Sequence, residues 1–145
     1  MGSEAKAEID QLAESFFGLF SNRGGITPDL ERIFELFVPQ GVIAKCTSSD
    51  PEISTLREFI TPRQDLLTNG ALTEFSEAET AERTQIFGNI ATRVSTYQKR
   101  GVLDGTPFTA RGMKSFQFVK TSQGWRILSV NWDDEREGFS IHDLL

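Results

Sequence analysis

Apolar residues recur at helical spacing near the start of the chain. Within residues 4–20, polar Glu and Lys side chains separate Ile9, Leu12, Phe16, Leu19 and Phe20. This pattern predicts an amphipathic helix with one buried face. A second helix is predicted over residues 27–37, because Thr27 supplies a helix cap and Pro28 favours the first helical position.

The centre of the chain mixes short strand and helix signals. Residues 42–46 form a short apolar run between turn residues, which predicts a strand. Two more pairs of a capping residue and a proline, Asp50-Pro51 and Thr61-Pro62, predict helix starts, and Asn69-Gly70 would close that helical stretch. The short strand must join a larger sheet, because a lone strand leaves its backbone groups unpaired.

After Gly70 the pattern changes from helical spacing to alternation. Four stretches rich in Thr, Val, Phe and Ile are predicted to be strands: 72–86, 88–99, 108–120 and 125–132. Helices followed by long strands are typical of an α+β domain. We therefore expect one domain over residues 1–145, with 138–145 as a candidate flexible tail.

Composition narrows the class of protein and of ligand. The 145 residues suit one domain with a single core. The chain contains 12 Phe but only 1 Tyr and 2 Trp, so its interior should be rich in rings that need no hydrogen-bond partner. This composition favours an apolar pocket that holds a small apolar molecule.

Charge and cysteine content exclude several partners. The net charge is −6 and the only adjacent basic pair, Lys99-Arg100, is interpreted as solvated charge beside a turn, so we expect no nucleic-acid partner. No apolar stretch reaches the length of a membrane span, and we expect no membrane partner. Cys46 is the only cysteine and His142 the only histidine, which predicts a cytoplasmic protein without a disulfide, metal or cofactor.

The last two predicted strands can be sorted into two faces. If residues 121–124 form the loop, Lys120 pairs with Trp125 and alternate side chains share a face. One predicted face carries Met113, Ser115, Gln117, Val119, Leu128, Val130 and Trp132. The opposite face carries Lys114, Phe116, Phe118, Lys120, Trp125, Ile127, Ser129 and Asn131. Because both faces are partly apolar, we expect the helices to cover one and a second copy of the chain to cover the other, as a homodimer.

Five residues are candidates for ligand binding on these strands. Ser115 and Gln117, predicted beside Trp132, would either orient a polar group of a ligand or bond to a neighbouring protein group. Arg93 and Tyr97 share a face of the preceding strand. Tyr97 can donate to a carbonyl oxygen and Arg93 can hold a carboxylate, whereas the alternative is packing on the strand surface.

Motifs in the second half of the chain resemble a group of uncharacterised bacterial proteins of the nuclear transport factor two-like superfamily. The motifs are Phe87-Gly88-Asn89-Ile90-Ala91, Ser95-Thr96-Tyr97, Arg111-Gly112, Ser115-Phe116-Gln117 and the run from Trp125 to Asp133. The resemblance spans roughly residues 4–137 in element order and implies N-terminal helices packed on a strongly curved antiparallel sheet. This cone-shaped half-barrel has an internal pocket and is usually dimeric. Members include ketosteroid isomerases, polyketide cyclases, dehydratases and non-catalytic binding domains, so the fold does not choose the function.

Catalytic patterns of that superfamily match this chain only in part. The isomerase pattern needs a tyrosine on the first helix and an aspartate on a late strand, but the first helix offers only phenylalanines and the late strand offers Ser115 and Gln117. The cyclase-like pattern uses a His or Asp dyad near the end of the last strand, where Asp134 can serve as a general base or remain a solvated surface charge.

Three functions therefore stay open. The first is a binding domain for a small, mostly apolar molecule contacted by Arg93, Tyr97, Ser115, Gln117 and Trp132. The second is a cofactor-independent lyase or isomerase that transfers protons with Asp134 as the base and Tyr97 or Gln117 as the oxyanion donor. The third is a non-catalytic dimerisation or partner-binding domain whose interior is filled by its own side chains.

Overall fold

The computed structural model describes residues 2–142 and 144–145, so Met1 and Asp143 of the predicted domain lie outside the described residues. The helical elements are α1 (Gly2–Gly18), the 3-10 turns η1 (Arg23–Gly25) and η2 (Leu30–Arg32), α2 (Ile33–Leu36) and α3 (Leu56–Thr68). The strands are β1 (Phe37–Lys45), β2 (Glu52–Thr55), β3 (Leu72–Phe87), β4 (Ile90–Leu103), β5 (Thr106–Thr121) and β6 (Gly124–Asp134).

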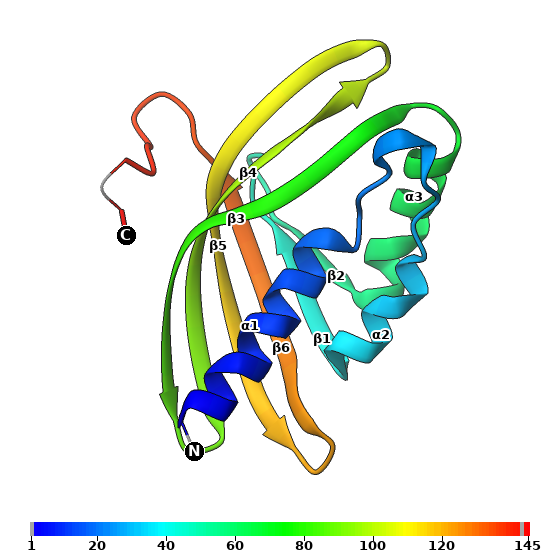
Figure 1. Ribbon diagram of the computed structural model, residues 1–145. Coiled ribbons are helices and arrows are strands. Elements are labelled where there is room, and N and C mark those ends of the chain that lie inside the picture. The colour runs from blue at the N-terminus through cyan, green and yellow to red at the C-terminus, as the bar shows by residue number, and fades with distance from the viewer. Residues whose placement is uncertain (1, 143) are drawn as a thin grey trace.

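These strands form one curved sheet in the order β2-β1-β6-β5-β4-β3. All three α-helices lie on its concave side (Figure 1). The predicted α+β class is confirmed, but the sheet is mixed, because β1 runs parallel to β6 while the other neighbours are antiparallel. The chain between β1 and β6 is a long crossover, and such a connection allows a parallel pair.

The core lies between α1 and the concave face of the sheet. The predicted apolar stripe of α1 is buried, and the Phe16 ring contacts the Phe116 ring of β5 edge-to-face, with centroids 5.9 Å apart. Three more rings lie edge-on to Phe16, those of Phe17, Phe20 and Phe37. The abundant phenylalanine thus forms the hydrophobic contact between the helix and the sheet.

The prediction that a helix starts at Asp50-Pro51 is wrong. Residues Glu52–Thr55 form strand β2, which pairs with β1. Helix α3 begins only at Leu56, because Thr55 and Glu58 exchange hydrogen bonds in a capping box that satisfies the first free backbone donors. Pro62 lies inside this helix rather than at its start.

A β-bulge in the last hairpin exchanges the predicted faces of β6. Lys120 pairs with Trp125 as predicted, and Phe118 pairs with Ile127, but Gln117 then pairs with Ser129. The extra residue, Leu128, moves the following part of β6 by one position relative to β5.

This shift corrects the predicted grouping of Ser115 and Gln117 with Trp132. Trp132 pairs with Lys114 and lies on the concave face, whereas Ser115 and Gln117 lie on the outer face of the sheet. The outer face also carries Leu128 and Ile90, which are 39% and 57% exposed. The homodimer predicted through this face stays a prediction. None of the helices among the described residues is both long and apolar enough to cross a membrane.

Candidate functional site

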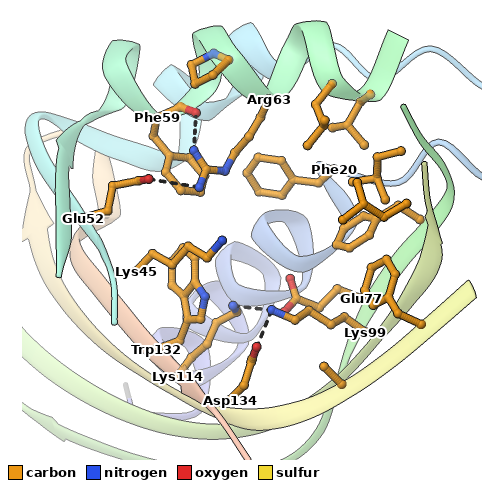
Figure 2. Close-up of a pocket in the computed structure, with 18 of the residues that line it drawn as sticks. Phe20, Lys45, Glu52, Phe59, Arg63, Glu77, Lys99, Lys114, Trp132 and Asp134 are labelled. Carbon is orange, nitrogen blue, oxygen red and sulfur yellow. Dashed lines mark hydrogen bonds and ion pairs between the residues drawn. The ribbon is translucent and has the colours of Figure 1, made fainter. Parts of the chain in front are cut away.

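A cavity of about 540 Å³ lies between α3, the end of α1 and the concave face of the sheet. Figure 2 shows the residues that line it. One side is apolar and is formed where the second half of α3 meets the start of β3 and the β4–β5 hairpin. Its side chains are Leu66, Leu67, Leu72, Phe75, Leu103 and Phe108.

Among the described residues, the remaining wall and the floor carry seven charged side chains, six of which form ion pairs. Two of the pairs join strands that are distant in sequence, whereas the third joins β2 to α3, the helix that follows it. The pairs and their N–O distances are Arg63–Glu52 at 3.1 Å, Lys99–Asp134 at 3.1 Å and Lys114–Glu77 at 3.0 Å.

Lys45 is the fourth cation of the cavity. It ends β1 and lies beside Trp132 of β6 in the parallel pairing of these strands. Figure 2 places it between the Glu52–Arg63 pair and the Trp132 indole. Within the described part of the chain, no carboxylate forms an ion pair with its ammonium group. Partial burial, followed by the charges of Arg63 and Lys99, lowers the pKa of Lys45.

Trp132 contributes a hydrogen-bond donor without an acceptor. Its side chain is only 7% exposed, and its ring packs edge-on against Phe59 with centroids 5.7 Å apart. Among the described residues, nothing accepts a hydrogen bond from its Nε1. Buried polar groups are nearly always paired with protein, water or ligand, so this N–H lacks the acceptor that such a group usually has.

Lys114 lies at the floor of the cavity and is 2% exposed. Its Nζ lies 4.0 Å from the Trp132 ring centroid and 4.4 Å from that of Tyr97, which stabilises a cation by interaction with the ring faces. Burial lowers the pKa of Lys114 to about 8, although the Glu77 carboxylate opposes this shift. Its ion pair with Glu77 has no well-aligned hydrogen bond at Oε2.

Asp134 lines the cavity, and Tyr97 supports it from below. The Tyr97 hydroxyl donates to Asp134 Oδ1 over 2.5 Å, and burial together with this bond raises the pKa of Tyr97. Tyr97 can approach the end of β6 this closely only because position 112 is a glycine. A Cβ there would lie 2.3 Å from the Tyr97 hydroxyl and 2.2 Å from the Asp133 carbonyl oxygen. Tyr97 therefore orients Asp134 and does not line the cavity itself.

Arg93 lies outside this cavity, in a second hollow of about 530 Å³ between α1 and β3. Its guanidinium is 3% exposed and donates to Glu79 over 2.7 and 3.0 Å, to Asp10 over 2.6 Å and to Thr84 over 2.9 Å. These hydrogen bonds occupy the guanidinium donors, and the bond to Asp10 joins α1 to the sheet. The carboxylate that Arg93 binds is thus the protein's own.

The structure brings two of the predicted site residues to the cavity wall, Trp132 and Asp134. Sequence reasoning missed the basic side chains Lys45, Arg63, Lys99 and Lys114, and the interpretation of Lys99 as solvated turn charge is wrong. A signal was present, because Lys114 alternates with Phe116 and Phe118, at a position where a buried side chain is expected. Among the described residues, no group of three His, Cys, Asp or Glu side chains lies close enough to hold a metal ion.

Comparison with known proteins identifies the fold. No protein-family model and no curated protein matches the chain. Among solved structures, a nuclear transport factor two-like superfamily protein from Salmonella enterica is similar with a TM-score of 0.77 and 16% identity, covering 95% of this chain and 96% of that one.

Two further solved structures agree with this result. A nuclear transport factor two-like protein of unknown function from Prochlorococcus has a TM-score of 0.73 and 16% identity over 97% of this chain and 98% of its own. An uncharacterised protein with a cystatin-like fold from Caulobacter vibrioides has a TM-score of 0.68 and 14% identity over 92% of this chain and 91% of its own. At these identities the similarity concerns the fold, and the chain has the nuclear transport factor two-like, cystatin-like fold.

Proposed function

We propose that this protein binds a small, mostly apolar molecule in the cavity above the concave face of the sheet. The observation that carries the proposal is the cavity itself, with about 540 Å³ of space lined by an apolar side and a polar side. Ligand sites in proteins typically occupy about 300–1,000 Å³, with apolar walls and a few polar groups that orient the ligand. A purely structural domain would fill this space with its own side chains.

Filling the cavity is expected to abolish binding of a neutral apolar probe. Nile red fluorescence should saturate on titration with the wild-type protein, because the dye leaves water for the apolar side. Ala110 lines the cavity, so Ala110→Phe places a ring in the space that the probe needs. We expect its affinity to fall by at least about tenfold, which corresponds to about 1.4 kcal/mol.

Ala7→Phe is the matched control, because Ala7 is exposed on α1 outside the cavity, and its affinity should equal that of the wild type. Thermal unfolding of both variants checks that they are folded. The proposal is contradicted if the wild type shows no saturable binding, or if Ala110→Phe binds the probe as tightly as the wild type.

A second candidate function is proton transfer to or from a bound carbonyl compound. The observation that favours it is the Asp134 carboxylate at the cavity wall, whose Oδ1 is held by Tyr97 and Lys99 while Oδ2 accepts no hydrogen bond from the described residues. An oriented carboxylate with one free oxygen is suited to act as a general base. Of the two predicted oxyanion donors, Tyr97 is committed to Asp134 and Gln117 lies on the outer face, so the donor here would be the Trp132 N–H.

This candidate predicts exchange of the acidic protons of a ketone in D₂O, followed by proton NMR. The exchange should exceed the buffer rate with the wild type and fall by at least about a hundredfold in Asp134→Asn, as for loss of a general base. Equal rates with the wild type, the variant and buffer would exclude proton transfer and leave the binding function untouched.

A further inference from the structure

The charges of the cavity do not balance. Its lining contains four cations, and three of them are neutralised by Glu52, Glu77 and Asp134 at N–O distances of 3.0 to 3.1 Å. Among the described residues that line the cavity, Lys45 is therefore left as one surplus positive charge. A half-buried ammonium without a counter-ion is costly, and a ligand with one negative charge would supply that counter-ion.

Lys45 and the unpaired Trp132 N–H lie side by side. The two residues are partners in the parallel pairing of β1 and β6, so their side chains leave the same face of the sheet at neighbouring positions. Both groups are donors only, and together they suit an acceptor that carries charge. A carboxylate has two acceptor oxygens, one for each of these donors. A phosphate dianion would need a second surplus cation, and the described residues of the cavity wall do not provide one.

The positions of Lys45 and the Trp132 N–H also define the orientation of a ligand. Lys45 and Trp132 belong to β1 and β6, whereas the apolar side comes from β3, the β4–β5 hairpin and the end of α3. In the strand order, β1 and β6 are separated from β3 by β5 and β4. The donors and the apolar side chains therefore lie at opposite sides of one cavity.

We propose that the ligand is an amphipathic monocarboxylate, whose carboxylate binds Lys45 and the Trp132 N–H while its apolar body contacts the side lined by Leu72, Phe75 and Phe108. This inference rests on the proposed binding function and adds the chemical class and orientation of the ligand. Bound carboxylate would also replace the missing counter-ion of Lys45 and raise the pKa of its ammonium group.

The test compares decanoate with decan-1-ol, which share the same alkyl chain and differ in the charged head group. Displacement of Nile red at concentrations below micelle formation measures both affinities. The wild type should bind decanoate at least about tenfold more tightly, since a charge-assisted hydrogen bond is worth more than a neutral one. Lys45→Met should remove this preference, while displacement of the dye by decan-1-ol is retained and shows that the cavity is intact.

Two further variants sharpen the result. Trp132→Phe replaces the indole with a smaller ring and removes the N–H, so decanoate affinity should fall about threefold or more, and that of decan-1-ol by less. Lys120→Met removes the same charge from an exposed position at the end of β5 and should behave as the wild type. If decan-1-ol binds as tightly as decanoate, or if Lys45→Met keeps the preference, the carboxylate inference is wrong while the binding function stands. If neither compound displaces the dye and the dye itself does not bind, the binding function fails.

Discussion

Replacing Glu77 with Gln is expected to lower the free energy of unfolding by about 3–5 kcal/mol at neutral pH, the usual cost of leaving one partner of a buried ion pair alone. The side chains of Glu77 and Lys114 are 7% and 3% exposed, so water cannot replace the lost carboxylate. Urea unfolding followed by tryptophan fluorescence measures the change. Glu14→Gln is the matched control, because Glu14 is exposed on α1 and its replacement removes the same charge with little expected effect.

The size of this effect should depend on pH in a defined direction. The pKa of Lys114 is about 8 in the folded protein, below the ordinary lysine value of 10.5 that applies to the unfolded chain. Between these two pH values the folded protein binds fewer protons than the unfolded chain, so its stability rises with pH. Loss of Glu77 lowers the pKa of Lys114 further, and the variant begins to gain stability at a lower pH. The difference between Glu77→Gln and the wild type should therefore shrink as the pH approaches 8.

A double variant separates the charge from the packing. Glu77→Leu combined with Lys114→Met replaces the pair with apolar side chains and should recover most of the lost stability, as is common for buried ion pairs. Equal stability of Glu77→Gln and the wild type at pH 6 and pH 8 would show that the pair is not buried in solution.

Phe116→Ala is expected to cost about 3–5 kcal/mol of unfolding free energy, because it leaves a cavity at the centre of the core. Phe116 is fully buried, and its ring contacts those of Phe16, Phe17 and Phe118 at centroid distances of 5.6 to 6.0 Å. These contacts join α1 to β5. Since Phe116 does not line the ligand cavity, the loss should appear in chemical unfolding without a matched change in Nile red affinity at temperatures where the variant is folded.

Phe87→Ala deletes the same side chain from a site that is 82% exposed and should change stability by less than about 0.5 kcal/mol. A similar loss in both variants would mean that the Phe116 ring is not the contact between helix and sheet that the structure shows.

The cavity explains why the sequence predicted some site residues and not others. Trp132 and Asp134 were found because they stand at the end of a strand with clear alternation, where an acid follows a large ring. Ser115 and Gln117 were misplaced because the alternation rule assumes an uninterrupted ladder, and the bulge at Leu128 adds one residue to β6. Both possible faces of β6 carry apolar residues, so the pattern gives no sign of the bulge.

The charged lining was missed for a different reason. Lys45 lies on β1, far in sequence from Lys99 on β4 and Lys114 on β5, and each alone is typical of a solvated surface position. The carboxylates that pair with Arg63, Lys114 and Lys99 come from β2, β3 and β6, so the balance of charge exists only after these elements are placed next to one another. The surplus charge on Lys45 is likewise a property of the assembled wall.

By itself the sequence determined the α+β order, the amphipathic first helix, the phenylalanine-rich core and the long antiparallel strands, because these follow from local periodicity and composition. Tertiary structure alone decided which face of the last hairpin lines the cavity, that β1 runs parallel to β6, and that Lys45 at the cavity wall has no ion-pair partner among the described residues. The physical reason is that ion pairing, register and burial depend on distances between residues far apart in the chain, and periodicity carries no information about those distances.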